Sequence, residues 1–353
     1  MTRIRVVVVE DSLTVRRRLV EVLAADPDLE VVGEAEDGRR AIELCRELRP
    51  DVITLDMVMP VMSGLAATEY IMAYFPTPIL IVSASMNRGD VFKTYDALAA
   101  GAVDVLDKSG SDEPEGAWEA RLVGAVKMVA RIKVITHPRA RLRLERPPGL
   151  PCAPAPSAAP RVVAIGASTG GPAAIVSVLS ALPAPFPAPI LLVLHISKRF
   201  GVAFADWLDG QTAHRVSFAT DGEPLAGPPG RVRMAPPDQH LVVRGDRLRL
   251  TREPERHSCR PSVDVLFESI AAELGSASAA CLLTGMGRDG ARGLLAIRAA
   301  GGATLAQDER TSVVFGMPRE AILLGAVERV LPLDEVGSAL AALVLPPGRS
   351  DHR

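Results

Sequence analysis

The chain is poor in aromatic residues, in cysteine and in net charge. Aromatic side chains make up 4% of its 353 residues, and its formal net charge at pH 7 is −2. This near balance gives no reason to expect a nucleic acid or an anionic membrane as a partner. The four cysteines are far apart and form no C-x-x-C pair, which indicates neither a disulfide framework nor a zinc site and suits a reducing cytoplasm. They are Cys45, Cys152, Cys259 and Cys281.

Long uninterrupted hydrophobic runs are also missing. The run near the N-terminus, Val6–Val9, is too short for the apolar core of a secretion signal. The uncharged stretch 162–194 is broken by Gly170-Gly171-Pro172 and by further prolines, whereas a membrane-spanning helix needs about 20 mostly apolar residues in a row. The sequence therefore predicts a cytoplasmic protein with no membrane insertion.

The first part of the chain alternates short apolar runs with amphipathic helical patterns. Strands alternating with helices predict a parallel sheet with helical crossovers. We therefore expect an α/β fold, and the length suggests two domains. The first domain is predicted over residues 1–125, with five strands at 4–9, 29–34, 52–55, 79–83 and 103–106.

A change of composition separates this part from a second α/β pattern. Residues 126–160 are expected to contain the end of a helix followed by a linker. The six prolines between Pro147 and Pro160 are typical of such a linker. From residue 161 buried runs and helices alternate again, so a doubly wound, mainly parallel α/β domain is predicted over 161–346. Residues 347–353 are expected to form a flexible tail. The clearest strands of the second domain are expected at 162–165, 190–195, 280–284 and 303–306.

Polar residues follow four of the five predicted strands of the first domain. Open parallel sheets bind ligands at the carboxyl ends of their strands. Three carboxylates meeting there repel one another, and a hard divalent cation such as Mg²⁺ offsets this repulsion. A single such residue is ordinarily a helix cap or a turn, but the ordered set favours a site where a phosphoryl group is added to a carboxylate. The set consists of Glu10, Asp11, Asp56, Ser83 and Lys108.

A glycine-rich turn opens the second domain with the sequence GASTGG, from Gly166 to Gly171. Pro172 stands where a P-loop has its lysine, and Ser168 stands at the second glycine position of a dinucleotide-binding fingerprint. What fits is G-x-S-x-G, in which a sharp turn after a strand presents a nucleophilic serine. The alternative is an ordinary glycine-rich turn, so the interpretation depends on partners elsewhere in the chain.

A nucleophilic serine needs a base and an acid that orients the base. Of the six histidines, His195 is the best base, because it ends the strand 190–195 that is expected beside the strand leading to Ser168. Asp289 follows another buried strand in a second glycine-rich turn and is the best acid. Asp264 and Asp308 remain alternatives for the acid. The other histidines lie in less suitable segments; they are His137, His214, His240, His257 and His352.

Residues 1–125 resemble a response-regulator receiver domain through VEDS, LDMVMPVMSG, VSAS and Lys108. The resemblance implies that Asp56 accepts a phosphoryl group from a histidine kinase and that Ser83 and Lys108 contact that group. It also implies that Mg²⁺ is held by the carboxylates of Glu10, Asp11 and Asp56 and by the backbone carbonyl of Val58. Two positions depart from the usual pattern, since Ser109 replaces a proline and Val105 replaces an aromatic residue.

Residues 161–335 resemble the catalytic domain of chemotaxis protein-glutamate methylesterases. The resemblance rests on GASTGG, His195, APPDQHL, RPSVDVLF, LLTGMGRDG and AQDERTSVVFGMPREA. It implies a triad of Ser168, His195 and Asp289 that needs no cofactor, with backbone N–H groups of Thr169 and Met286 as oxyanion donors. The implied substrates are glutamyl methyl esters, and glutamine amides, of chemoreceptors.

Two other classes of function are alternatives to a phosphorylation-activated serine hydrolase. One is a signalling module that binds a partner without turnover, but the presence of both Ser168 and His195 favours the hydrolase. The other is a receiver with a DNA-binding output. No helix-turn-helix pattern and no strongly basic C-terminal domain supports that class.

Overall fold

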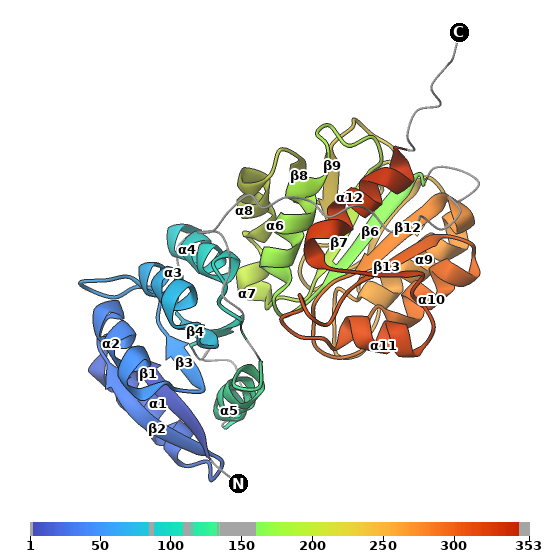
Figure 1. The fold of residues 1–353 in the computed structure, drawn as a ribbon. Coiled ribbons are helices and arrows are strands. Elements are labelled where there is room, and N and C mark those ends of the chain that lie inside the picture. The colour runs from blue at the N-terminus through green and yellow to red at the C-terminus, as the bar shows by residue number, and fades with distance from the viewer. Residues whose placement is uncertain are drawn as a thin grey trace. The chain divides into compact units, whose positions relative to one another are not determined.

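The computed structural model describes residues 3–84, 88–108, 114, 116–132, 134 and 160–345. The chain divides into two compact units, residues 1–146 and 147–353, and each is described by itself (Figure 1). The predicted linker and tail lie mostly outside the described residues, as does Ser109.

The first unit is a five-stranded parallel sheet, as predicted. Its strand order is β2-β1-β3-β4-β5, which is the flavodoxin-like order. The chain leaves β1 for one edge of the sheet and returns to β3 on the other side, so strand order reverses between these two strands. The strands are β1 (Ile4–Val9), β2 (Leu29–Ala35), β3 (Val52–Leu55), β4 (Ile79–Ser83) and β5 (Asp104–Asp107).

Helices cover both faces of this sheet. Helices α1 and α5 contact each other, while α3 contacts both α2 and α4, so the helices form two groups. The last helix ends at Val129, so the domain boundary predicted at residue 125 falls inside it. The helices are α1 (Leu13–Ala24), α2 (Gly38–Leu48), α3 (Gly64–Tyr74), α4 (Arg88–Ala99) and α5 (Ala117–Val129).

The second unit is built on a seven-stranded parallel sheet with the order β14-β13-β12-β6-β7-β9-β8. Its four central strands were predicted, because each is a fully buried apolar run. They are β12 (Ser278–Leu282), β13 (Ala303–Gln307), β6 (Val162–Ala167) and β7 (Ile190–Leu194). The sequence interpretation missed the outer strands, which are short and partly exposed, and an antiparallel hairpin. These are β14 (Arg329–Leu331), β9 (Arg231–Met234), β8 (Arg215–Phe218), β10 (His240–Arg244) and β11 (Arg247–Thr251).

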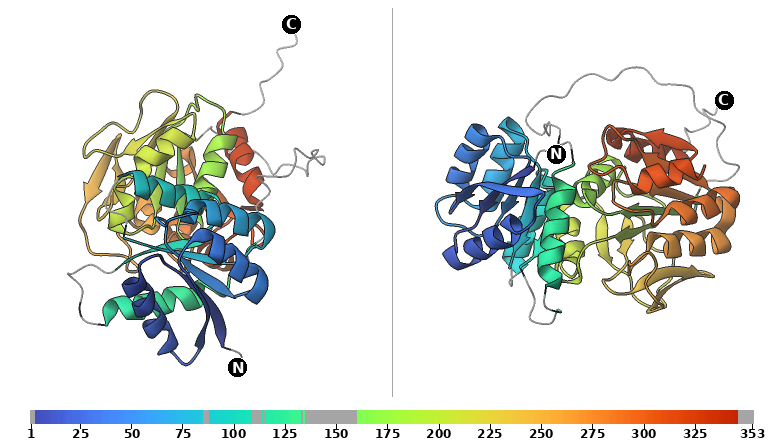
Figure 2. Two further views of the ribbon diagram at one scale, coloured as in Figure 1. Left: turned by 90° about the vertical axis from the view of Figure 1, so that its left-hand side faces the viewer. Right: turned by 90° about the horizontal axis from the view of Figure 1, so that it is seen from below.

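Helices again lie on both faces of this sheet (Figures 1 and 2). Helix α6 packs against α12, while α10 packs against α9 and α11. The helices are α6 (Gly171–Ala181), α7 (Lys198–Gly201), α8 (Phe204–Gln211), α9 (Val263–Leu274), α10 (Ala291–Ala299), α11 (Met317–Leu323) and α12 (Leu333–Val344), with a short 3₁₀ turn at Gly275–Ala277.

Strand β6 is the central strand on which the site depends. It pairs with β7 on one side and with β12 on the other, and both pairs are parallel. From β6 the chain runs outward to β7, continues to the edge strand β8 and to β9, and then returns to β12, so strand order reverses beside β6. Segments that follow β6, β7 and β12 therefore meet at one edge of the sheet, where open α/β folds bind ligands.

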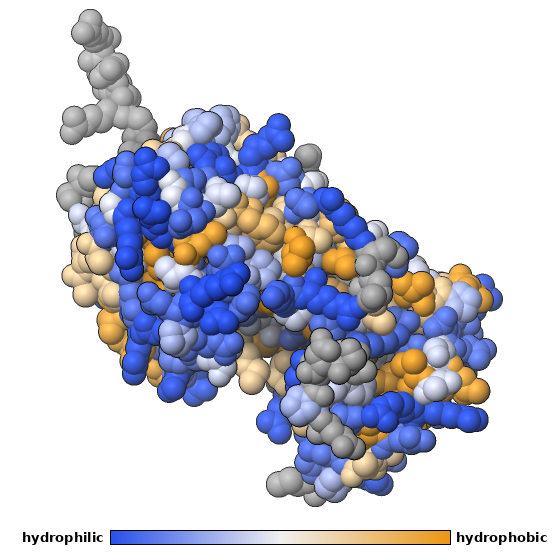
Figure 3. Space-filling model, turned by 180° about the vertical axis from the view of Figure 1, so that it is seen from behind, coloured by the Kyte–Doolittle hydropathy of each residue, from blue (hydrophilic) through white to orange (hydrophobic). Residues whose placement is uncertain are grey.

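The surface carries mostly hydrophilic side chains with scattered apolar patches on the face that Figure 3 shows. Among the described residues, no helix combines the length and the apolar character needed to cross a membrane.

Close packing of α9 on α10 predicts that Gly293→Ala destabilises the second unit. A Cβ atom at Gly293 would lie 2.6 Å from Phe267 Cβ and 2.9 Å from the carbonyl oxygen of Asp264. We expect the free energy of unfolding to fall by about 1–3 kcal/mol, as for other overpacked sites. Urea unfolding followed by Trp207 fluorescence, in a Trp118→Phe background, measures this change.

The matched control is Gly210→Ala in α8, where a Cβ would meet no heavy atom within 4 Å. Because alanine favours helix over glycine by up to about 1 kcal/mol, this variant should be no less stable than the parent. Equal effects of the two substitutions would contradict the role assigned to the α9–α10 contact.

Candidate active site

The first unit gathers two buried carboxylates around one lysine. Glu10 and Asp56 follow β1 and β3 and are 2% and 6% exposed. Lys108, which follows β5, places Nζ 2.6 Å from Glu10 Oε2 and 2.9 Å from Asp56 Oδ2. The other oxygen of Asp56, Oδ1, accepts a hydrogen bond of 2.7 Å from the backbone N–H of Met57. The sheet therefore brings together residues that the sequence places far apart.

This cluster has the composition of a site for a hard divalent cation. Ligand oxygens of Glu10, the exposed Asp11 and Asp56 lie within 4.8 Å of one another. Burial raises the pKa of Glu10, and Asp56 adds to this, while Lys108 opposes it. Three carboxylates facing one lysine leave negative charge that a cation bound to these oxygens would neutralise.

The remaining residues of the predicted phosphoryl site lie at the same edge or beside it. Ser83 ends β4 and is buried, and its carbonyl oxygen accepts a hydrogen bond of 3.0 Å from Lys108 N. Val58, expected to offer its carbonyl, is half exposed and follows Asp56 by two positions. Val105 lies in β5 opposite Ile81, so the position that is usually aromatic carries a small aliphatic side chain.

The second unit joins His195 to Asp289. His195 follows β7 and Asp289 lies in the turn between β12 and α10, and His195 Nε2 is 2.9 Å from Asp289 Oδ2. The Asp289 side chain is 3% exposed and that of His195 is 14% exposed, so water screens this pair only weakly. The base and the acid predicted from the sequence are thus in direct contact.

The N-terminus of α9 fixes the Asp289 carboxylate. Oδ1 accepts hydrogen bonds from Ser262 Oγ at 2.8 Å and from Asp264 N at 3.1 Å, and Oδ2 accepts one from Val263 N at 2.7 Å. Free N–H groups at a helix start favour an anion. Burial alone would raise the pKa of Asp289, but the bonds from His195, Ser262 and Val263 more than offset it and lower the pKa. Asp289 is therefore a fixed anion that orients His195.

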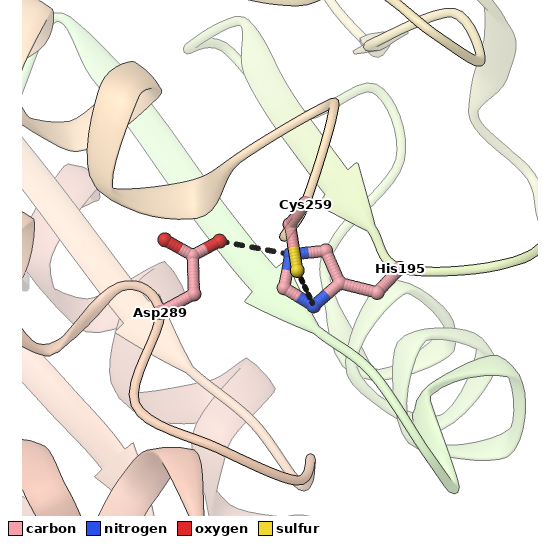
Figure 4. Close-up of side chains that lie close together, drawn as sticks. All are labelled: His195, Cys259 and Asp289. Carbon is pink, nitrogen blue, oxygen red and sulfur yellow. Dashed lines mark hydrogen bonds and ion pairs between the residues drawn. The ribbon is translucent and has the colours of Figure 1, made fainter. Parts of the chain in front are cut away.

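The other ring nitrogen of His195 faces a cysteine. Cys259 Sγ lies 3.8 Å from His195 Nδ1, and Figure 4 shows the thiol and Asp289 at different nitrogens of the ring. Burial opposes the charged imidazolium, but Asp289 and Cys259 outweigh it and raise the pKa of His195 to about 9. No sequence pattern had pointed to Cys259.

Ser168 lies beside His195 at the end of the neighbouring strand. Ala167 of β6 pairs with Leu194 of β7, and His195 N donates a hydrogen bond of 3.0 Å to Ala167 O. Since neighbouring strands are about 4.8 Å apart, the residues that follow them begin side by side. Ser168 is half-buried, and its hydroxyl forms no hydrogen bond within the part of the chain that the structure describes.

The loop after β12 packs directly against Ser168. Ser168 N donates a hydrogen bond of 3.0 Å to Thr284 O, and a Cβ at Gly285 would lie 2.7 Å from Ser168 Cβ. Gly285 therefore lets this loop, with the backbone of Met286, approach the serine closely. Thr169 lies between Ser168 and the start of α6, and its carbonyl accepts a hydrogen bond of 3.0 Å from Thr284 Oγ1. Of the residues predicted to supply oxyanion donors, Thr169 thus follows Ser168 directly, and Met286 follows Gly285, which lies against Ser168.

A cavity of about 520 Å³ opens next to the His195–Asp289 pair. Its wall includes Cys259, Met286 and Asp289, whereas Ser168 and His195 lie outside the lining. The remaining lining residues are His257, Ser258, Gly287, Arg288 and Glu320.

The alternative acids have other partners. Asp264 Oδ2 lies 3.1 Å from His257 Nε2, and Asp308 Oδ1 accepts a hydrogen bond of 2.9 Å from Thr311 N. Neither is the acid that contacts His195.

Two other histidines have structural contacts. His214 places Nε2 3.1 Å from Leu179 O, and buried His240 accepts a hydrogen bond of 3.1 Å at Nδ1 from Ser262 N. His137 and His352 lie outside the described residues.

Because Asp289 accepts four hydrogen bonds, we expect Asp289→Asn to destabilise the second unit. An asparagine NH₂ group would face donors, and an unmatched buried polar group costs about 1–3 kcal/mol. The lowered pKa means that the Asp289 carboxylate contributes stability above its unfolded-state pKa of about 4 and loses it as pH falls through the folded-state pKa. Urea unfolding at pH 7 and pH 3 should therefore show a difference between parent and variant that shrinks in acid.

Asp308→Asn is the control for this comparison, because Asp308 is a half-buried turn residue whose side chain contacts Thr311 and Arg310. A destabilisation of Asp289→Asn that does not depend on pH would contradict the stabilising role of the ionised carboxylate.

Two family models match the chain. The model described as CheB methylesterase matches residues 163–340, and the model described as response regulator receiver domain matches residues 6–114. The crystal structure of the Thermotoga maritima CheB methylesterase catalytic domain is 36% identical, with a TM-score of 0.50, and covers 53% of this chain and 100% of its own.

Curated relatives match over nearly the whole length. "Protein-glutamate methylesterase/protein-glutamine glutaminase 2" of Anaeromyxobacter dehalogenans is 45% identical and covers 96% of this chain and 97% of the relative. The protein of the same name from Pseudomonas aeruginosa is 44% identical and covers 96% of each chain. The chain belongs to the family of CheB methylesterases that carry a response regulator receiver domain.

Proposed function

We propose that this chain is a phosphorylation-activated serine hydrolase that demethylates glutamyl methyl esters of chemoreceptors and deamidates receptor glutamines. The names of its full-length relatives support the substrate class. The observation that carries the proposal is the contact of His195 with the buried Asp289 beside Ser168. A module that only binds a partner has no need of such a pair next to a serine.

The contact with Asp289 supports Nδ1 of His195 as the ring nitrogen that serves the nucleophile. Nε2 of His195 is bonded to Asp289, so Nδ1 is left to take the proton of Ser168. As Ser168 Oγ attacks the ester carbonyl, His195 becomes an imidazolium that Asp289 stabilises. His195 then returns the proton to the departing methoxide, which leaves as methanol.

The acyl-enzyme is hydrolysed by the reverse sequence. A water molecule takes the place of methanol, His195 accepts its proton, and Ser168 leaves as the product carboxylate forms. Glutamine follows the same path with ammonia as the leaving group, because an amide passes through a similar tetrahedral intermediate. Neither reaction needs a cofactor in this scheme.

Backbone N–H groups of Thr169 and Met286 are proposed to bind the oxyanion. Thr169 directly follows the nucleophile, and Met286 lies in the loop that Gly285 brings against Ser168. A donor of this kind typically contributes about 3–4 kcal/mol to stabilising the transition state.

In the receiver, Asp56 is proposed to accept the phosphoryl group. Its Oδ2 already contacts the Lys108 ammonium, which would neutralise charge on the added group. Ser83 is proposed to donate a hydrogen bond to it. Mg²⁺, when bound, supplies positive charge that stabilises the transferred phosphoryl group; the oxygens of Glu10, Asp11 and Asp56 and the carbonyl of Val58 are proposed to hold it.

The partners follow from these two activities. A histidine kinase is the proposed phosphodonor, and chemoreceptor segments in the cytoplasm are the proposed substrates. No nucleic acid is expected as a partner, because the formal net charge is −2.

Removing either the nucleophile or the base should abolish hydrolysis. We expect Ser168→Ala and His195→Gln to reduce methanol release by about three to six orders of magnitude, since members of such a triad act as a unit. The assay collects radiolabelled methanol from methylated receptor membranes. Asp308→Asn changes a carboxylate that bonds to Thr311 and not to His195, so this variant should keep its turnover. Normal turnover by Ser168→Ala would show that another residue is the nucleophile.

Phosphorylation at Asp56 should raise the hydrolysis rate. With a small-molecule phosphodonor and Mg²⁺, we expect the parent chain to incorporate one phosphoryl group and to accelerate, and Asp56→Asn to do neither. A tenfold activation corresponds to a bias of about 1.4 kcal/mol between inactive and active states. A fragment starting at Arg161 lacks Asp56 and is the control that should ignore the phosphodonor; label retained in Asp56→Asn would place the modification elsewhere.

A further inference from the structure

His195 has one ring nitrogen available for proton transfer, and a thiol stands next to it. Nε2 is bonded to Asp289 at 2.9 Å, while Nδ1 faces Cys259 Sγ at 3.8 Å. Ser168 must use the same nitrogen if it is to pass its proton to His195. The thiol and the serine hydroxyl therefore both need the same ring nitrogen, Nδ1.

A tight turn delivers Cys259 to this position. Arg256 and Cys259 exchange backbone hydrogen bonds of 3.1 and 2.9 Å across His257 and Ser258. The two central residues have φ values of 53° and 58°, the left-handed conformation that two-residue hairpin turns of this type need. The backbone of the turn thus fixes the location of the sulfur atom.

The hydrogen bonds of the thiol define the protonation of the ring. Cys259 donates its S–H to His257 O at 3.4 Å, which leaves the sulfur as an acceptor toward His195 Nδ1. Asp289 is likewise an acceptor at Nε2. An imidazole that donates to acceptors at both nitrogens is an imidazolium, and His195 in that form has no lone pair for a Ser168 proton.

We propose that Cys259 is a positioning residue that occupies Nδ1 of His195 and competes with Ser168 for this nitrogen, which holds the base in an unreactive form until the thiol gives way. This inference rests on the proposed function, because it takes His195 as the base for Ser168. Sulfur is a weak hydrogen-bond partner, so substrate binding can displace it.

The charges around His195 agree with this reading. Asp289 and Cys259 are the titratable groups that contact the ring, and together they raise the pKa of His195 to about 9. Several charged groups on the neighbouring loop, α9, the β12–α10 turn and α7 pair with one another. These pairs are Arg256 with Glu268, His257 with Asp264 and with Arg288, and Lys198 with Asp238.

The sign of the effect follows from the requirement for a neutral base. Below its pKa His195 is protonated, so kcat/KM should rise with pH up to about 9. Removing the sulfur acceptor lowers this pKa. For each pKa unit by which the His195 pKa falls, the fraction of neutral imidazole at pH 7 rises about tenfold. The value of kcat/KM at pH 7 should rise by the same factor. Above pH 9 the parent and the variant should converge.

The test combines a titration of His195 with a pH profile of the full-length chain. The parent and Cys259→Ala are labelled with ¹³C-histidine, and the His195 signal is identified by its loss in His195→Gln. We expect Cys259→Ala to lower the midpoint of the His195 titration and to raise kcat/KM at pH 7 in the phosphodonor-stimulated methanol assay. Cys259→Ser, which restores an acceptor at a shorter reach, should lie between the parent and the alanine variant.

Several results would overturn the proposal. An unchanged His195 midpoint in Cys259→Ala would show that the thiol does not hold the ring. A lowered midpoint without a rise in kcat/KM at pH 7 would show that it holds the ring without competing with Ser168. If Cys259→Ala fails to fold, the parent and Cys259→Ser decide, and a parent midpoint near the ordinary value of about 6.5 rejects the contact.

The failure of this proposal differs from a failure of the proposed function. The titration reports the contact between Cys259 and His195 without any turnover. Should Ser168→Ala retain hydrolysis while Cys259→Ala still lowers the His195 midpoint, the nucleophile would be misassigned but the contact would stand.

Discussion

The arrangement of the site in the second unit depends on the hydrogen bonds that the buried carboxylate of Asp289 accepts. It accepts hydrogen bonds from Ser262, Val263, Asp264 and His195, which belong to the start of α9 and the end of β7. An isolated charge at this depth is strongly unfavourable, so the chain must bring all these donors to it. The charge thereby holds its own β12–α10 turn to these two segments and orients the imidazole.

The carboxylates of the first unit illustrate the opposite arrangement. Asp56 accepts one backbone hydrogen bond at Oδ1 and contacts Lys108 at Oδ2, whereas Asp289 accepts four hydrogen bonds, about as many as a carboxylate can. A saturated carboxylate is suited to holding a neighbour in place. One with few partners keeps oxygen atoms available for a cation and for covalent modification, and both types of site form at the carboxyl ends of parallel strands.

The sequence predicts the central parts of this molecule better than the periphery. Fully buried strands such as β6 and β7 are uniform apolar runs, so their location and the residues that follow them could be inferred. Outer strands such as β8 are short and half exposed, and their pairing depends on neighbours that no local pattern reveals. The contact between His195 and Asp289 could be expected because each residue follows a strand of the same parallel sheet.

Cys259 could not be found in this way. It lies in a loop without periodicity, and its approach to His195 depends on positive φ values at His257 and Ser258. Such values are ordinarily a property of glycine, and these two side chains give no signal of them. The backbone donors to Asp289, Val263 N and Asp264 N, were equally hidden, since backbone N–H groups leave no trace in the choice of residue.

The pairing of β6 with β7 has a consequence for how the length of this chain can vary through evolution. Ala167 faces Leu194, and the two residues that follow them face the same edge. Successive side chains of a strand point to opposite faces, so an insertion or deletion of one residue within either strand would turn Ser168 or His195 toward the other face of the sheet. The segment between α8 and β9 lies on the outer side of the sheet and bears no such constraint. Lineages can therefore lengthen or shorten the periphery, while the two inner strands must keep an unchanged residue count.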